Sequence, residues 1–303
     1  MTDRYIRYSE TKKFKRCRRA WDLGYRRQLM LPPNPEAPAS GKRDVGTLFH
    51  AGMEHYYADG GSPVHLIQQR AEEHRLQFGG MTKEWGDTYT LAEIMADGYV
   101  QWLASEGMDV GEVTVGVEFG LTVYIGEIYG DRVFLVIHMD RLVYQPEWDQ
   151  WVIEDLKTVD TLAKDLQFQV DDQLLTYAVV LRRALGITAT TARHRMARKV
   201  KRTARATPPF YGEVSIGINE DQFSAHWTHL WGLLHDMVSV MQRLESNAAN
   251  QHLAAYPNPT RDCSWDCDFL PVCANLDDGT NIEPLLNSLY IRRSDLPTGE
   301  VHA

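Results

Sequence analysis

The chain has 303 residues, of which 44% are hydrophobic and 24% charged, and its formal net charge at pH 7 is −9. Such a chain can bury a sizeable core, and we expect one main domain with additions. No run of eighteen apolar residues is present, which excludes a membrane-spanning helix, and residues 1–8 lack the apolar region of a signal peptide. We therefore expect a cytoplasmic protein with no membrane partner.

The distribution of charge is more informative than its sum. The acidic total argues mildly against a nucleic-acid partner, because phosphate binding depends on Lys and Arg. Yet residues 12–27 hold eight Lys and Arg side chains against the single acid Asp22, and residues 193–205 hold no acid at all. Either segment alone could be a solvated helix face. Because the two flank the candidate active site described below, we expect them to contact phosphate.

Helical spacing dominates the first third of the chain. Ser9 can cap a helix that contains Cys17, since its hydroxyl accepts the free N–H groups of a first turn. Four prolines exclude a helix at residues 31–40, which we predict to be a linker. Further helices are predicted at residues 46–57, 64–78 and 90–105.

A β-rich region follows. From residue 112 hydrophobic side chains alternate with smaller or polar ones, and residues 132–144 and 150–159 are rich in Val, Ile and Leu. These patterns predict three adjacent strands in a meander. We predict next a helix at residues 171–185 that stops at Gly186, a strand at residues 188–200 and a long helix at residues 221–250. From residue 277 the chain is polar, and we expect a loosely held end.

Two residues of the strand at 150–159 suggest chemistry. Asp155 and Lys157 stand two positions apart, so their side chains share one face, whereas Glu154 should point away. Antiparallel pairing with the preceding strand would bring the carboxylate of Asp140 near Asp155, and two convergent carboxylates form a site for Mg²⁺ or Mn²⁺. A lysine beside them can orient an attacking water or stabilise charge developing on phosphate. Taken alone, an acid-x-Lys tripeptide is more often the polar face of an edge strand.

The wider pattern resembles a known family. Read from Asp140 through Asp155-Leu156-Lys157-Thr158 to Gln173 and Tyr177, the chain resembles the PD-(D/E)xK nuclease superfamily, in its RecB-like and Cas4-like branch. Gln173 and Tyr177 are four residues apart and share a helix face. The resemblance implies that both line the active site and contact substrate.

The same resemblance assigns two further residues. His50, at the end of the sequence Gly46-Thr47-Leu48-Phe49-His50, would be a metal ligand together with Asp140 and Asp155, and Glu118 takes the place of an early glutamate in many relatives. The chain departs from the family at Ile137, where relatives usually carry glycine three residues before the strand aspartate.

The four cysteines form a second constellation. Cys17 stands apart, whereas Cys263, Cys267 and Cys273 lie together. A cytoplasmic protein rarely uses such a set for disulfides, and zinc sites are usually built from two close pairs, so one plus three is less typical of Zn²⁺. Four buried free thiols are the structural alternative. The layout resembles nucleases of the same branch in which one N-terminal and three C-terminal cysteines bind a [4Fe–4S] cluster.

These resemblances predict a fold and a domain plan. We expect an α/β, restriction-endonuclease-like core with a mixed central sheet flanked by helices, a helical N-terminal block, and an iron–sulfur cluster joining the two chain ends. The predicted segments are a helical segment with the first cluster cysteine at 1–110, the nuclease core at 111–215, the long helix and three-cysteine segment at 216–276, and a tail at 277–303.

The expected function is a Mg²⁺- or Mn²⁺-dependent DNA exonuclease. The resemblance implies action on DNA ends or single strands in recombination, repair, or phage or CRISPR DNA processing, with a helicase, recombinase or CRISPR protein as a conceivable partner. Two alternatives stay open at this stage. One is a non-catalytic iron–sulfur module that binds DNA or docks a partner; the other is a nuclease of the same class with Zn²⁺ at the four cysteines.

Overall fold

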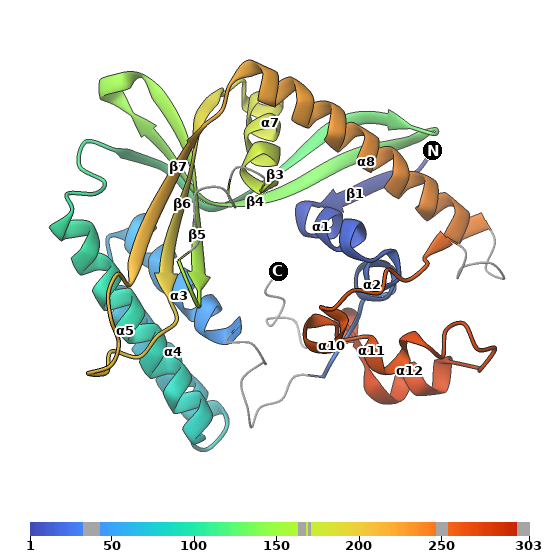
Figure 1. Ribbon diagram of the computed structural model, residues 1–303, viewed down its shortest axis with the longest axis horizontal. Helices are drawn as coiled ribbons and strands as arrows, with labels where there is room; N and C mark the ends of the chain where they lie inside the picture. The colour runs from blue at the N-terminus through green and yellow to red at the C-terminus, as the bar shows by residue number, and fades with distance from the viewer. Residues whose placement is uncertain (33–42, 163–167, 169–170, 247–253, 296–303) are drawn as a thin grey trace. The chain divides into compact units, whose positions relative to one another are not determined.

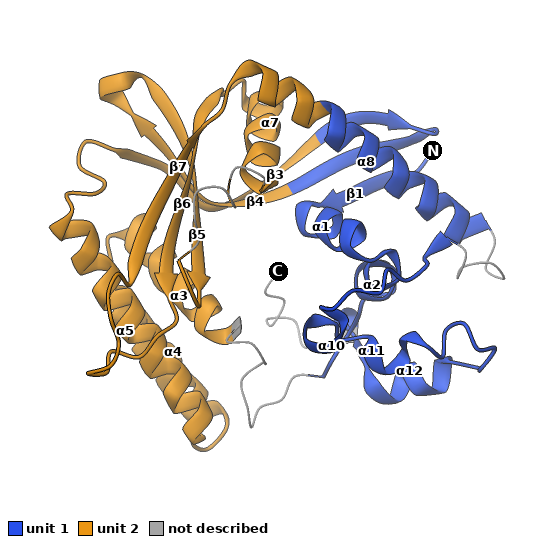
Figure 2. Ribbon diagram, viewed as in Figure 1, with its two compact units in different colours: residues 1–33, 124–136, 228–303 blue, residues 34–123, 137–227 orange. Residues whose placement is uncertain are grey.

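The computed structural model describes residues 1–32, 43–162, 168, 171–246 and 254–295 (Figure 1). The chain forms two compact units, and neither is a continuous stretch of sequence (Figure 2). The first unit comprises residues 1–33, 124–136 and 228–303, and the second comprises residues 34–123 and 137–227. Strands β3 (Val113–Ile128) and β4 (Asp131–Gln145) and helix α8 (Glu220–Ser246) contribute residues to both.

The second unit contains a mixed sheet, as predicted. The later part of β4 pairs antiparallel with β5 (Gln150–Val159), β5 pairs parallel with β6 (Ala189–Arg198), and β6 pairs antiparallel with β7 (Tyr211–Gly217). Strand β3 pairs with β4, so the predicted three-strand meander is present. A short 3-10 turn at Pro146–Trp148 joins β4 to β5.

Four helices lie wholly within the described residues of the second unit. They are α3 (Arg43–Asp59), α4 (Pro63–Gln77), α5 (Lys83–Ser105) and α7 (Gln173–Leu185). The hydroxyl of Thr82 accepts the N–H of Trp85, so α5 begins seven residues before the predicted start at Thr90. Helices α3, α4 and α5 lie side by side (Figure 1), and their buried faces share a core with Leu156 of β5. Helix α7 ends at Gly186, whose φ of 69° suits glycine, as predicted.

The first unit is built around the two ends of the chain. Strand β1 (Asp3–Arg7) pairs parallel with the first part of β4, and β2 (Leu29–Met30) pairs antiparallel with β8 (Ile291–Arg292). Other elements in the described residues of this unit are α1 (Tyr8–Arg16), α2 (Arg18–Trp21), the π-helical turn Asp22–Arg26, α10 (Cys263–Asp266), α11 (Leu270–Cys273), α12 (Glu283–Leu289) and the turn Arg293–Asp295. Ala20, Phe269 and Tyr290 belong to one buried cluster, which unites the chain ends.

Some sequence predictions differ from the structure or lie outside the residues that it describes. Ser9 does not cap a helix: α1 begins at Tyr8 after the β1 strand, which is short and was not expected within a helical block. The prediction of a loosely held end is wrong for residues 283–292, because Leu286 and Tyr290 are 1% and 4% exposed. The predicted linker lies almost wholly outside the described residues, as do the last residues of the helix predicted at 221–250. Within the described parts, no helix has both the length and the apolar character needed to cross a bilayer.

Candidate active site

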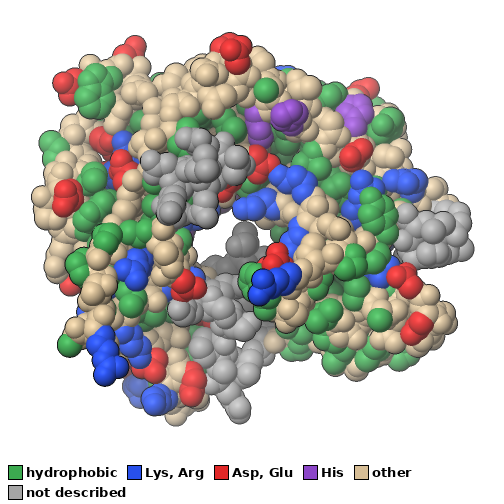
Figure 3. All heavy atoms as spheres, in the orientation of Figure 1, with side chains coloured by type: hydrophobic (Ala, Val, Ile, Leu, Met, Phe, Trp, Pro, Cys, Tyr) green, Lys and Arg blue, Asp and Glu red, His purple; other side chains and the backbone are tan. Residues whose placement is uncertain are grey.

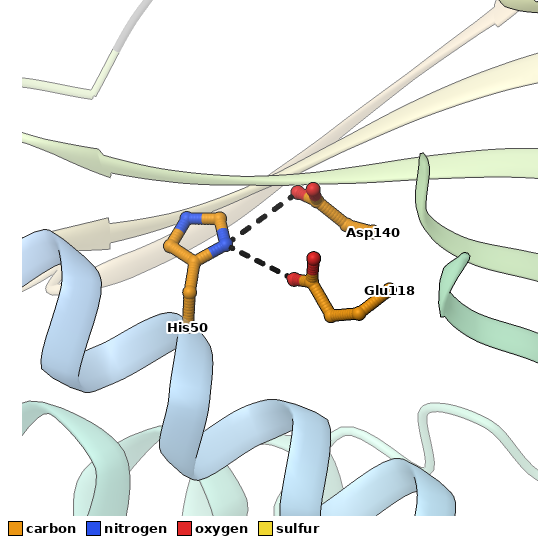
Figure 4. A group of neighbouring side chains, drawn as sticks. All are labelled: His50, Glu118 and Asp140. Atoms are coloured by element: carbon orange, nitrogen blue, oxygen red, sulfur yellow. Dashed lines mark ion pairs between the residues drawn. The ribbon is translucent and has the colours of Figure 1, made fainter. Parts of the chain in front are cut away.

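Three potential metal ligands converge in the second unit. They are His50 on α3, Glu118 on β3 and Asp140 on β4, and one ligand atom from each lies within 4.8 Å of the other two. The Nδ1 atom of His50 is 3.7 Å from both Glu118 Oε1 and Asp140 Oδ2 (Figure 4). The side chains are 29%, 17% and 16% exposed, so an ion held there would remain reachable from solvent.

The backbone of Glu118 has an unusual conformation at this group. Glu118 has a φ of 43°, in the left-handed region that non-glycine residues rarely adopt. Such a conformation costs on the order of 1–3 kcal/mol and persists only where surrounding structure enforces it. It occurs inside β3, so it interrupts the alternation of that strand, and the side chain meets His50 and the exposed His138.

Asp140 carries the strongest electrostatic perturbation in the group. Burial and the neighbouring carboxylate of Asp155 raise its pKa to about 7, although His50 and the backbone N–H of Leu156 favour the ionised form. That N–H donates to Asp140 Oδ2 over 2.7 Å and fixes the carboxylate against β5. Burial alone would lower the pKa of His50, but Glu118 and Asp140 outweigh it and raise that pKa. Surplus negative charge therefore gathers where a cation would neutralise it.

A second array lies beside this group. Lys157 Nζ donates to Asp155 Oδ1 and to Gln173 Oε1, both over 2.9 Å, and Gln173 Nε2 donates to Asp155 Oδ1 over 2.9 Å and to Tyr177 Oη over 3.1 Å. Asp155 is 3% exposed and Lys157 is 31% exposed, so the ammonium group is the member of the pair that solvent can reach. The acid-x-Lys pair and the helical Gln-Tyr pair thus meet across β5 and α7.

The structure sorts the predicted site residues into these two sets. His50, Glu118 and Asp140 form one, and Asp155, Lys157, Gln173 and Tyr177 form the other. Asp155, a predicted ligand, lies outside the 4.8 Å group, whereas Glu118 lies inside it. The electrostatic effect of Asp155 on Asp140 shows that the sets adjoin.

Sequence reasoning missed two histidines here. The Nδ1 atom of His138 is 3.2 Å from Glu118 Oε2, and that of His194 is 3.0 Å from Asp155 Oδ2. His138 stands two residues before Asp140 on one strand, so alternation could have placed both on one face. His194 could not be found that way, because only the pairing of β5 with β6 brings it to Asp155.

Comparison with known proteins decides the family. The family model described as the PD-(D/E)XK nuclease superfamily matches residues 7–274. The chain belongs to the PD-(D/E)XK nuclease superfamily. No curated protein matches it.

Two solved structures are similar to this nuclease at low identity. A putative exonuclease from Eubacterium rectale is 14% identical with a TM-score of 0.48, and the match covers 89% of this chain and 87% of that one. LHK-Exo in complex with dAMP is 11% identical with a TM-score of 0.29, over 68% of this chain and 97% of that one. The assignment to the family rests on the family model.

The four cysteines of this nuclease line one pocket in the first unit. The pocket has a volume of about 350 Å³, and Cys17, Cys263, Cys267 and Cys273 all contribute to its wall. All four are free thiols, and no three of their sulfur atoms lie within 4.8 Å of one another. Burial raises the pKa of the Cys267 thiol, and the proximity of Cys17 and Cys263 adds to that rise.

Many arginines of the two basic segments form ion pairs or are buried within the protein. In the first segment five arginines pair with acids: Arg16 with Asp266, Arg18 with Asp236, Arg19 with Asp277, Arg26 with Asp22, and Arg27 with Glu283. In the second, Arg193 and Arg195 are 6% and 1% exposed. Lys and Arg side chains do gather where β6 connects to β7, at the lower left of Figure 3. The sequence therefore overstates the positive charge that remains for phosphate.

Proposed function

We propose that this nuclease is a divalent-metal-dependent DNA exonuclease that hydrolyses phosphodiester bonds. The observation that supports it most is the adjacency of the His50, Glu118 and Asp140 group to the array around Asp155 and Lys157. A half-buried cluster of carboxylates beside a lysine has the components for metal-assisted hydrolysis. The preference for ends rests on the RecB-like and Cas4-like resemblance of the sequence.

The donor set suits a divalent cation. His50, Glu118 and Asp140 would hold it, with Asp155 as a further predicted ligand, and one nitrogen among carboxylate oxygens fits Mn²⁺ better than Mg²⁺, which favours all-oxygen sites. When bound, such a cation supplies Lewis acidity and lowers the pKa of a water.

The remaining residues have separable roles in the proposed reaction. Lys157 places a positive charge where the scissile phosphate would develop negative charge, or orients the attacking water. Gln173 holds Lys157 and Asp155 in their relative positions through its amide, and Tyr177 holds the amide in turn. His138, 55% exposed, lies at the solvent side of Glu118.

The test of this function is degradation of DNA with and without Mn²⁺. We expect labelled DNA to be degraded only with the metal, and substrates labelled at one end at a time to release mononucleotides or short products from an end. Persistence of a circular single strand would support exonuclease action. A gel shift without products in Mn²⁺ would instead favour a non-catalytic DNA-binding protein.

Glu118→Gln should weaken metal use. The amide keeps the size of the side chain but removes a charge from the ligand group, so we expect the Mn²⁺ concentration for half-maximal cleavage to rise about tenfold or more. The matched control is Glu127→Gln at an exposed position of the same strand. Equal metal requirements in both variants would exclude Glu118 as a ligand.

Metal affinity should also depend on pH through Asp140. Because its pKa is raised to about 7 in the metal-free protein, protons compete with the cation below that pH. The affinity for the cation is therefore highest above pH 7 and falls by up to about tenfold per pH unit below it. Calorimetric titration with Mn²⁺ at pH 6 and pH 8 measures this, and equal affinities would contradict it.

For the cysteine pocket we propose a [4Fe–4S] cluster. Around a tetrahedral Zn²⁺ with bonds of about 2.3 Å, thiolate sulfurs stand about 4 Å apart, and no three sulfurs here are within 4.8 Å. An iron–sulfur cluster is larger than one ion, so its four ligating sulfurs stand further apart. This spacing fits a pocket of about 350 Å³ whose wall holds Cys17 from the N-terminal part of the chain and three cysteines from the C-terminal part.

Cys267→Ser should remove this cluster. We expect anaerobically purified wild-type protein to be brown and to contain about four iron and four sulfide per chain, and the variant to lose both. The first unit should melt at a lower temperature, because the cluster cross-links residues 17 and 273. Stoichiometric zinc in a colourless wild-type protein would replace the proposal with a zinc site.

A further inference from the structure

The carboxylate of Asp155 is held from two sides. Its Oδ1 atom accepts hydrogen bonds from Lys157 Nζ and Gln173 Nε2, whereas Oδ2 faces His194 Nδ1 at 3.0 Å. His194 and Asp155 are 2% and 3% exposed in their side chains, so water does not compete for this contact. A carboxylate is an acceptor only, so the ring must carry its proton on Nδ1 and donate it.

The strand register brings His194 beside Asp155. Strands β5 and β6 run parallel with Asp155 opposite His194, and opposed residues of neighbouring strands direct their side chains to the same face of the sheet. The neighbouring pairs, Glu154 with Arg193 and Leu156 with Arg195, belong to the other face. A slip of one residue in either direction would set Arg193 or Arg195 opposite Asp155 in place of His194.

Two further features fix the imidazole. Phe168 stacks on it with ring centroids 4.1 Å apart and planes 23° apart, which limits rotation of the ring. On the opposite face of β6, Arg193 and Arg195 pair with Glu154 of β5 at 3.1 Å and 3.3 Å. These buried ion pairs tie the two strands in the register that places His194.

We propose that His194 is a positioning residue for Asp155 in the nuclease site. This inference rests on the proposed function, since it assigns His194 the task of holding a carboxylate that adjoins the metal-ligand group. With His194 in place, the carboxylate of Asp155 is hydrogen-bonded at both oxygens and keeps one orientation. Without His194 it is hydrogen-bonded only at Oδ1 and can rotate. In metalloproteins, loss of a residue that hydrogen-bonds a ligating carboxylate typically lowers metal affinity or activity by about 10–100-fold.

The test compares His194→Asn with His194→Leu. The amide nitrogen of Asn can take the place of Nδ1 and donate to Oδ2, whereas Leu fills similar space without a donor. We expect His194→Leu to lower Mn²⁺ affinity in calorimetry, and kcat for DNA cleavage, by about 10–100-fold, and His194→Asn to restore most of both. If His194 were merely structural, the hydrogen-bond donor of Asn would not restore Mn²⁺ affinity and kcat.

The matched control is His226→Leu. His226 is also buried, at 8% exposure, and its Nε2 lies 2.8 Å from the hydroxyl of Thr176 on α7, whereas the hydrogen bonds to Asp155 come from Lys157, Gln173 and His194. This variant should lose thermal stability without a change in Mn²⁺ affinity. If His194→Leu binds Mn²⁺ and cleaves as wild type does, or if Asn and Leu are equally impaired, the positioning role is excluded.

A different result marks failure of the proposed function itself. Wild-type protein that binds Mn²⁺ but does not cleave DNA would refute the nuclease assignment of the site, while calorimetry on the His194 variants would still decide whether the histidine positions Asp155. Cleavage by wild type with unchanged His194→Leu would refute the positioning role alone.

Discussion

Lys157→Ala should reduce metal-dependent DNA cleavage by about 10²–10³-fold, as the loss of one preorganised positive group at a developing charge does in other enzymes. In this structure Lys157 is the solvent-accessible cation of the array, and Asp155 raises its pKa in spite of burial, which keeps the ammonium charged at neutral pH. The alanine variant removes that charge and the hydrogen bonds to Asp155 and Gln173, but leaves the His50, Glu118 and Asp140 group untouched. Mn²⁺ binding should therefore fall much less than kcat.

Arg75→Ala is the control for this experiment. Arg75 lies outside both basic segments and pairs with Glu72 at 2.6 Å, where the two side chains are 53% and 55% exposed, and such surface pairs contribute little. The variant should cleave as wild type does. Both proteins should keep the visible absorbance of the proposed cluster, which lies in the other unit. Wild-type cleavage rates in Lys157→Ala, with single-turnover kinetics to exclude a rate-limiting product release, would remove Lys157 from the mechanism.

Periodicity could predict the parts of the site that are local in sequence. Alternation placed Asp155 and Lys157 on one face, and they are hydrogen-bonded; helical spacing placed Gln173 beside Tyr177, and their side chains are 3.1 Å apart. These pairs depend on the 2.0 and 3.6 residue periods, which the sequence carries directly. The mixed sheet was instead expected from the family resemblance.

Periodicity could not predict what depends on register or on unusual backbone. Glu118 belongs to the ligand group and has a φ of 43°, a backbone conformation that no alternation rule anticipates. His194 depends on the pairing of β6 with β5, and the arginines of the basic segments find acids far away in sequence, such as Arg19 with Asp277. The division into four consecutive segments remains a prediction. The two compact units of the structure are each built from separate stretches of the chain, and the first unit contains both chain ends.

The face of β5 opposite the site carries a buried ion network. Glu154 has no exposed surface, and its carboxylate pairs with Arg141 and Arg193 at 3.1 Å each and with Arg195 at 3.3 Å. Arg141 and Arg195 also share Asp109, at 2.9 Å and 2.7 Å. This network explains why Glu154, although adjacent in sequence to Asp155, takes no part in the candidate site.

Glu154→Gln should destabilise the second unit by about 3–5 kcal/mol, because removal of one partner leaves buried guanidinium charge uncompensated. The shape of the side chain is kept, so the effect reports on charge rather than on a cavity. Urea unfolding followed by tryptophan fluorescence measures it, with Glu72→Gln as control, since Glu72 pairs with Arg75 where both side chains are more than half exposed. That control should unfold as wild type does. Because Arg193 and Arg195 flank His194, Glu154→Gln should also weaken Mn²⁺ binding in the protein that remains folded. Unchanged stability would contradict the prediction. It would mean that backbone hydrogen bonds between β5 and β6 alone hold the strand register and the position of His194.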